Sequence, residues 1–389
     1  MIIEPKIRGF ICTTAHPIGC ATNVQRQIDH VVVTGPITSS RKRVLVLGCS
    51  TGYGLASRIV NTFGSGADTI GVSFEKEPSE TKTASAGWYN NRAFEKRAKA
   101  AGRVAITVEG DAFSDAIKAD TIAQIREHLG QIDLIVYSLA SPVRTDPKTG
   151  EVYRSAIKPM QSAVRSKTLN TGTGEVSEVE IQPATAEEAQ ATVKVMGGED
   201  WELWIAALSE AGVLADGFLT LNYTYLGSEL TWPIYNKGTL GRAKADLDRA
   251  AAAIRSQFGA DSAYVVALKA VVTQASSAIP VVPLYGTLLL RVMDEMGLGE
   301  GCIEQIDRLF RDKLQPPVVL DADHRVRVDD WELSSTVQDE MTYRWGLLST
   351  ETLANLADLD KHRAEFLKLF GFGLGGVDYA ADVDPRDIG

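Results

Sequence analysis

The feature that most constrains the fold is a regular alternation of short apolar runs and longer amphipathic stretches between residues 43 and 141. The apolar runs predict buried strands at 43–48, 69–74, 104–108 and 132–137. The stretches between them predict helices at 52–63, 91–101 and 115–129. Strands that alternate with helices of this length are joined by right-handed crossovers. The pattern therefore predicts an α/β protein with a doubly wound parallel sheet of the Rossmann type.

The alternation stops at residue 142 and resumes after residue 199. Residues 142–199 are polar, and Val176, Val179 and Ile181 suggest a hairpin within an ordered insertion near a functional edge. The rest of the chain predicts strands at 218–225 and 264–272 and a helical C-terminal extension with segments at 303–314, 337–345 and 352–369. We therefore expect residues 1–389 to form one enlarged Rossmann-type domain.

Composition narrows the class of protein further. Hydrophobic residues make up 44% of the chain, enough for a large core, and the net charge of −10 disfavours a nucleic-acid-binding surface. The sequence has no uninterrupted apolar stretch of the roughly 18 to 20 residues that a membrane helix needs. Its start, MIIEPKIRGF, lacks the pattern of a signal peptide, and its four cysteines are too few for a disulfide scaffold. These features predict a cytoplasmic protein without nucleic-acid or membrane partners.

The strongest local motif is Gly48-Cys-Ser-Thr-Gly52-Tyr-Gly54, which joins the first predicted strand to the first predicted helix. Glycines at such a turn let the backbone approach a pyrophosphate, whose charge the helix N-terminus stabilises. The spacing is typical of short-chain dehydrogenases. A tight turn without a ligand is the plain alternative. A hydrolase nucleophile elbow at Ser50 is a weaker one, because an elbow normally follows several strands.

An acidic residue follows the second predicted strand, at the position where dinucleotide-binding folds contact the adenosine ribose. Glu75 lies 21 residues after Gly54. A carboxylate there accepts hydrogen bonds from the ribose hydroxyls and repels a 2′-phosphate, so the residue favours NAD over NADP.

Tyr235 and Lys244 are the catalytic candidates, close to the start of the helix that follows the fifth predicted strand. The tyrosine would donate a proton or hydrogen bond to a substrate oxygen, and the lysine would bind the nicotinamide ribose and lower the tyrosine pKa. On an ideal helix a nine-residue offset is about 900°, which puts the two side chains on opposite faces. Both reach one site only if Tyr235 precedes the helix, with Thr239 as the expected N-cap. Otherwise they are a helix-start tyrosine and a surface lysine.

Three further patterns carry no predicted chemistry. Gly371-Phe-Gly-Leu-Gly-Gly376 matches a dinucleotide fingerprint in letters, but no strand precedes it and no helix follows it. Cys12, His16 and Cys20 supply three ligands where a structural zinc site needs four, so no metal is expected. The remaining histidines considered are expected on the surface: His128, His324 and His362.

Three motifs together resemble the FabV-type trans-2-enoyl-ACP/enoyl-CoA reductases: the turn 48–54, the pair Tyr235-x8-Lys244, and Ile11-Cys-Thr-Thr-Ala-His-Pro-Ile-Gly-Cys20. The similarity covers essentially the whole chain, including Gly376-Val-Asp-Tyr379. The eight-residue gap is the specific feature, because other short-chain dehydrogenases and enoyl-ACP reductases have shorter gaps. The resemblance implies a monomeric enzyme that uses NADH to reduce the C2–C3 double bond of an enoyl thioester, carried by acyl carrier protein or CoA, in fatty acid synthesis.

The resemblance also implies roles for particular residues. Hydride would reach the β-carbon, and Tyr235 would serve the enolate oxygen and act as proton donor, with Tyr225 contacting the substrate as a candidate second donor. Lys244 would contact NAD, together with Gly48, Cys49, Ser50, Thr51, Gly52, Tyr53, Phe74, Glu75, Asp111, Ala112, Leu139, Ala140, Thr273, Gln274 and Ala275. The pattern independently puts Asp111, Ala140 and Thr273 at strand ends along the carboxyl edge of the sheet. A carbonyl or alcohol dehydrogenase and a non-catalytic NAD-binding sensor remain the alternatives.

Overall fold

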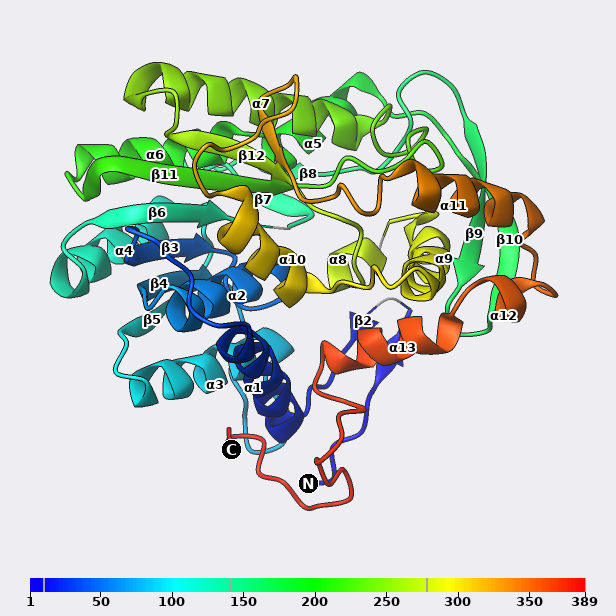
Figure 1. Ribbon diagram of the computed structural model, residues 1–389, viewed down its shortest axis with the longest axis horizontal. Helices are drawn as coiled ribbons and strands as arrows, with labels where there is room; N and C mark the ends of the chain where they lie inside the picture. Colours follow the sequence, from blue (N-terminus) through cyan, green and yellow to red (C-terminus); the bar gives the residue numbers. More distant parts are fainter. Residues whose placement is uncertain (10, 140, 278, 389) are drawn as a thin grey trace.

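A seven-stranded parallel sheet forms the centre of the protein (Figure 1). The computed structural model describes residues 1–9, 11–139, 141–277 and 279–388. The strand order is β13-β12-β11-β6-β3-β4-β5, and every neighbouring pair is parallel. The strands are β3 (Arg43–Leu47), β4 (Asp68–Ser73), β5 (Ala105–Glu109), β6 (Ile132–Tyr137), β11 (Leu214–Thr224), β12 (Ala263–Ala267) and β13 (Arg325–Arg327). The order reverses between β3 and β6, so the predicted doubly wound Rossmann-type sheet is confirmed.

Helices cover both faces of the sheet. Successive residues of β3 point to opposite sides: Val44 and Val46 belong to one core cluster, and Leu45 and Leu47 to the other. The first cluster is covered by α1 (Pro17–Thr34), α2 (Gly52–Ile59), α3 (Ala86–Ala100) and α10 (Cys302–Arg308). The second is covered by α4 (Asp115–His128), α6 (Glu199–Glu210) and α7 (Thr239–Phe258). A strand buried on both faces needs an apolar side chain at nearly every position, which explains the continuous runs.

The predicted elements are confirmed with shifted ends. The helix expected at 52–63 is α2 with a π-helical turn at Val60–Gly64, and the one expected at 303–314 is α10 with a similar turn at Leu309–Lys313. The strand expected at 264–272 is wrong beyond Ala267. There the backbone amides of Lys269 and Ala270 donate to the side chains of Gln305 and Glu332, so the chain leaves the sheet.

The insertion is ordered and touches the region around the catalytic candidates. It contains β7 (Val143–Thr145), β8 (Val152–Arg154), β9 (Val164–Asn170), β10 (Glu175–Ile181) and α5 (Ala186–Met196). β9 and β10 pair as the predicted hairpin. The backbone of Lys158 accepts a hydrogen bond from the Thr239 amide (3.0 Å), at the start of α7.

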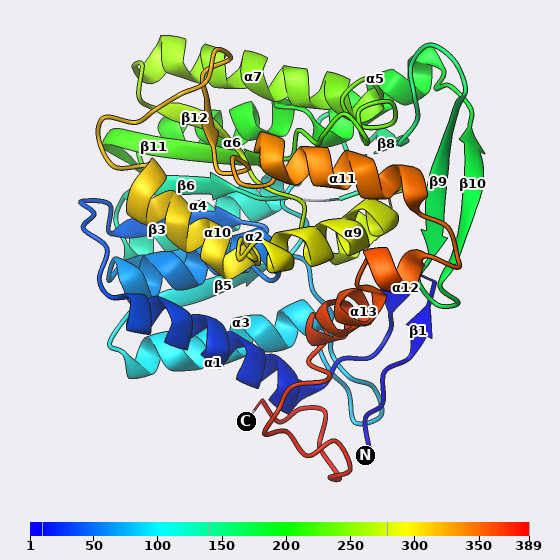
Figure 2. The ribbon, with the colours of Figure 1, turned by 45° about the vertical axis from the view of Figure 1, so that its right-hand side comes forward.

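The C-terminal extension returns along the sheet edge to the N-terminus. It comprises α8 (Gln274–Ser277), α9 (Val282–Glu295), α11 (Ser335–Leu347), α12 (Leu353–Leu356) and α13 (Leu359–Lys368). The helix expected at 352–369 is two helices, because Asp358 caps α13 by accepting from the Lys361 amide. Both chain ends lie at the same end of the molecule (Figure 2), where Val383 donates to the Met1 carbonyl (3.0 Å) next to the hairpin of β1 (Ile7–Arg8) and β2 (Ile11–Cys12).

No helix within the described ranges is both long and apolar enough to cross a membrane.

The contact between α1 and the C-terminal segment gives a stability test. A Cβ on Gly19 would overlap the carbonyl oxygen of Gly371, so Gly19→Ala must displace one of the two backbones. We expect a loss of about 1–3 kcal/mol in the free energy of unfolding. Gly346→Ala in α11 is the matched control, because its Cβ meets nothing within 4 Å, and it should gain up to about 1 kcal/mol. Equal urea-unfolding midpoints for the two variants would contradict this packing.

Candidate functional site

The turn between β3 and α2 is closely packed where the strand order reverses. Gly48 has a φ of 82°, and a Cβ there would overlap the carbonyl oxygen of Ser138, beyond β6. A Cβ on Gly54 would overlap the carbonyl oxygen of Gly48. Thr51 is the N-cap of α2 but makes no side-chain capping bond, and the first turn contains no acidic residue. The first amides of α2 are therefore left for an anion at the carboxyl edge of the sheet.

Glu75 lies beside this turn. The Ser50 hydroxyl donates to Glu75 Oε1 (2.6 Å), which links the two predicted cofactor residues directly. A Cβ on Gly87 would overlap Glu75 Oε1, so the N-terminal turn of α3 packs against the carboxylate. Phe74 is 78% exposed. The neighbouring Lys76 is also exposed.

Other predicted cofactor residues lie around the same edge of the sheet. Some can offer a ligand only backbone atoms, and others can also offer side chains. Cys49 is buried, so only its backbone can meet a ligand, and the Tyr53 hydroxyl donates to the Lys269 carbonyl (2.9 Å). Asp111 accepts from the Phe113 amide (3.0 Å) two residues beyond β5, and a Cβ on Gly52 would lie 3.9 Å from Thr273 Cγ2. Thr273 lies in the loop before α8 and does not end a strand. Ala112 is buried, Leu139 half-buried, and Gln274 and Ala275 exposed, while Ala140 lies outside the described residues.

Tyr235 and Lys244 line one cavity of about 280 Å³. The helix α7 begins at Thr239, so Tyr235 precedes it, as the shared site requires. The expected N-cap is wrong: Gly238 is the N-cap and Thr239 the first helical residue. A Cβ at Gly238 would overlap the Ile234 carbonyl, and the Thr239 hydroxyl donates to the insertion at the Ala156 carbonyl. The other residues lining the cavity are Tyr225, Leu226, Asn236, Gly241, Ala245 and Arg325.

Burial sets the protonation of this pair. It raises the pKa of the Tyr235 hydroxyl above its ordinary value, so the residue is a neutral O–H donor near pH 7. The expected lowering of this pKa by Lys244 is therefore wrong for the ligand-free protein, where burial dominates. Burial also lowers the pKa of Lys244 to about 8. Among the described residues the Lys244 ammonium has no hydrogen-bond or ion-pair partner, so it can donate to a ligand hydroxyl.

Tyr225 and Tyr235 differ in what their hydroxyls do. Their rings meet edge to face with centroids 5.0 Å apart. The Tyr225 hydroxyl donates to Glu332 Oε1 (3.1 Å), whereas the Tyr235 hydroxyl has no hydrogen-bond partner among the described residues. The Tyr225 proton is thus already engaged. Of the two hydroxyls, only that of Tyr235 is free to donate into the cavity.

A second, mainly apolar cavity lies beside the loop that leads to α8 and α9. Its walls contain Lys269 and His362 among apolar and small residues: Ala270, Val271, Val272, Ser276, Val282, Pro283, Gly286, Leu289 and Leu290. The expectation that His362 is a surface residue is wrong, because its side chain is buried in this wall. Burial lowers the pKa of His362 to about 4, so it is neutral near pH 7. His128 and His324 are exposed as predicted.

Sequence reasoning missed the supports behind these residues. The Lys118 ammonium donates to the carbonyls of Ala112 (3.1 Å) and Phe113 (3.0 Å) and pairs with Asp200 (2.9 Å), which shapes the loop after β5. Asp200 and Glu332 are both almost completely buried. Glu332 belongs to the charged run Asp329-Asp-Trp-Glu332, which is typical of a surface, so no local signal reveals either role.

The two patterns rejected from the sequence have structural roles. Among the described residues no three His, Cys, Asp or Glu side chains are grouped to hold a metal. His16 caps α1 by accepting from the Gly19 amide (3.2 Å), and Cys12 donates to the Thr14 carbonyl (3.2 Å). Gly371 follows α13 and packs against α1, so its segment does not form a strand-to-helix turn.

A doubly wound sheet, a glycine turn at its switch point, a nearby carboxylate and a Tyr–Lys pair in one cavity define a nicotinamide-dependent reductase of the short-chain type. Family models match the chain at residues 2–80 (NAD(P)H binding domain of trans-2-enoyl-CoA reductase), 82–315 (trans-2-enoyl-CoA reductase catalytic region) and 320–383 (enoyl reductase FAD binding domain). The chain belongs to the trans-2-enoyl-CoA reductase family.

Curated relatives and solved structures match this chain over nearly its full length. The FabV enoyl-[acyl-carrier-protein] reductase [NADH] of Aeromonas salmonicida is 56% identical over 99% of this chain and 98% of its own. The trans-2-enoyl-CoA reductase of Treponema denticola in complex with NAD superposes with a TM-score of 0.95 at 47% identity, covering 99% of this chain and 98% of that one. The trans-2-enoyl-CoA reductase of Clostridium acetobutylicum in complex with NADH superposes with a TM-score of 0.96 at 39% identity, and the match covers 100% of both chains.

The residues matched as a flavin-binding region do not fit a flavin. Residues 320–383 supply β13 to the central sheet and the helices α11, α12 and α13. The only dinucleotide-like motif there, 371–376, packs against α1 and starts no helix. We therefore assign no step to a flavin.

Proposed function

We propose that this protein uses NADH to reduce the C2–C3 double bond of trans-2-enoyl thioesters in fatty acid synthesis, with Tyr235 as the group that serves the substrate oxygen. The observation that carries the proposal is the shared cavity of Tyr235 and Lys244, in which Tyr235 keeps a free hydroxyl. The thioester is carried by acyl carrier protein or CoA. Purified protein mixed with crotonyl-CoA should oxidise NADH, which is followed by its absorbance; activity on a ketone alone would contradict the proposal.

The residues at the sheet edge fit a dinucleotide. The backbone around Gly48 and Gly54 has no room for side chains, and the uncapped amides of α2 suit a pyrophosphate. The Glu75 carboxylate can accept bonds from both adenosine ribose hydroxyls. Lys244 can donate to the nicotinamide ribose. When bound, the nicotinamide supplies a hydride to the β-carbon of the substrate.

The protein's own contribution is orientation and a proton. Hydride addition at the β-carbon leaves negative charge on the enolate oxygen, which the Tyr235 hydroxyl stabilises by donating a hydrogen bond. A proton added at the α-carbon then completes the saturated thioester. The raised pKa of Tyr235 keeps this donor protonated near pH 7. The cavity that Tyr235 and Lys244 line, of about 280 Å³, offers space for the reacting end of the substrate.

The role of Tyr235 gives the first kinetic test. Tyr235→Phe removes only the hydroxyl, so NADH affinity should stay near the wild-type value. We expect kcat to fall by roughly two to four orders of magnitude, the usual effect of losing a positioned acid. Wild-type turnover in this variant would show that water or Tyr225, and not Tyr235, donates to the thioester oxygen of the substrate.

The charge of Lys244 gives a pH test. Its pKa of about 8 means that the ammonium predominates at pH 7 and is mostly lost at pH 9. The KM for NADH of the wild-type enzyme should therefore rise between pH 7 and pH 9. Lys244→Met keeps the aliphatic stem, and its KM should be high at pH 7 and change little with pH. A wild-type KM in this variant at pH 7 would rule out the ribose contact.

Cofactor choice tests Glu75. Its carboxylate would meet a 2′-phosphate as like charge against like, which costs several kcal/mol, so kcat/KM should favour NADH by about 100-fold or more. Glu75→Ala should narrow that ratio. Lys76→Ala is the matched control, and we expect it to alter the preference only slightly because the exposed Lys76 side chain, unlike Glu75, forms no hydrogen bond with the glycine turn in the described part of the chain. If Glu75→Ala leaves the ratio of kcat/KM for NADH to kcat/KM for NADPH unchanged, Glu75 does not select the cofactor.

A further inference from the structure

Glu332 is a fully buried carboxylate (0% exposed) between β13 and α11. It accepts three hydrogen bonds: from the Tyr225 hydroxyl (3.1 Å), from the Tyr285 hydroxyl (2.7 Å) and from the Ala270 amide (2.7 Å). These donors come from three different parts of the chain: the end of β11, helix α9 and the segment after β12. A carboxylate has lone pairs for all three, so the arrangement fits its ionised form.

A buried carboxylate costs several kcal/mol of desolvation unless it is well paired. Burial accordingly raises the pKa of Glu332, while the bonds from Tyr285 and Ala270 and the charge of Lys269 oppose that rise. A second contact fixes the geometry: Gln338 donates to the Glu332 carbonyl (2.7 Å) and to the Tyr285 hydroxyl (3.2 Å). The carboxylate therefore has one defined orientation with respect to Tyr225.

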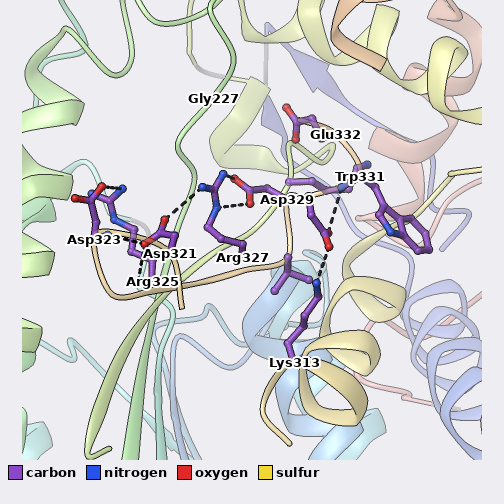
Figure 3. A network of polar contacts seen from close by, with 12 residues as sticks. Gly227, Lys313, Asp321, Asp323, Arg325, Arg327, Asp329, Trp331 and Glu332 are labelled. Atoms are coloured by element: carbon purple, nitrogen blue, oxygen red, sulfur yellow. Dashed lines mark hydrogen bonds and ion pairs between the residues drawn. The ribbon is translucent and has the colours of Figure 1, made fainter. Parts of the chain in front are cut away.

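The segment that carries Glu332 is itself held by ion pairs (Figure 3). Arg327 pairs with Asp329 through two hydrogen bonds (2.7 and 2.8 Å). Asp330 pairs with Lys313 (2.6 Å) and with Arg308 (2.7 Å), whose guanidinium also lies 4.3 Å from the Trp331 ring centroid. These contacts flank Glu332 on its N-terminal side, so its backbone has little freedom to move.

We propose that Glu332 is a positioning residue for the reaction, acting through Tyr225 on Tyr235; this inference rests on the proposed role of Tyr235. By accepting the Tyr225 hydroxyl, Glu332 fixes the ring that packs edge to face on Tyr235. The same bond removes Tyr225 as a competing donor to the substrate oxygen. Glu332 is buried and lines neither of the two cavities described above, so its loss should affect kcat and leave NADH binding unchanged.

A double-mutant cycle with Glu332→Gln and Tyr225→Phe tests this coupling. Glu332→Gln keeps the shape but presents an N–H group to one of the three donors, which disrupts the site. We expect kcat to fall about tenfold, with the KM for NADH within twofold of wild type. In the Tyr225→Phe background the same substitution should cost less than twofold. Unchanged kcat in Glu332→Gln, or a full tenfold loss in both backgrounds, would overturn the proposal.

A control separates positioning from a general effect on folding. Tyr285→Phe removes the other hydroxyl from the same carboxylate oxygen without touching the ring that contacts Tyr235. Its kcat should fall less than that of Tyr225→Phe, and this comparison holds even if Glu332→Gln does not fold. An equal or larger loss in Tyr285→Phe would overturn the proposal. If Tyr235→Phe keeps full activity, the proposed role of Tyr235 fails, and this outcome is distinct from a failure of the Glu332 coupling.

Discussion

The close approach of β3 and β6 at the reversal of strand order is the constraint on which the site depends. Because a side chain at Gly48 would overlap the backbone beyond β6, the turn into α2 is held at the carboxyl edge of the sheet. The uncapped start of α2, the carboxylate of Glu75 and the loop at Thr273 then meet in one place. A crevice at this reversal is where open α/β sheets bind ligands.

The chemistry is added to this edge by segments far apart in the chain. The turn before α7 carries Tyr235, and the insertion holds the start of that helix through Thr239. The C-terminal extension supplies Glu332, which follows the edge strand β13 and accepts the Tyr225 hydroxyl. Family membership and NAD-bound or NADH-bound relatives of nearly identical fold agree with a nicotinamide site here. A catalytic centre assembled in this way gains rigidity from ion pairs and buried hydrogen bonds around it.

Much of the fold was predictable because strands such as β3 and β6 are buried on both faces and therefore have continuous apolar runs. The glycine turn and the offset between Tyr235 and Lys244 were also local signals. The end of β12 could not be predicted from local signals, because the backbone after it donates to the side chains of Gln305 and Glu332, which are distant in sequence. His362 and Glu332 have polar side chains in polar sequence surroundings, and only tertiary packing buries them. The single-domain boundaries, the monomeric state and the cytoplasmic location stay predictions.

The most direct test of the account is a crystal structure of the protein with NAD and an unreactive enoyl thioester. The account predicts the thioester oxygen within about 3.2 Å of the Tyr235 hydroxyl, with the Tyr225 hydroxyl still bonded to Glu332. An oxygen bound instead by Tyr225, with its bond to Glu332 broken, would contradict it.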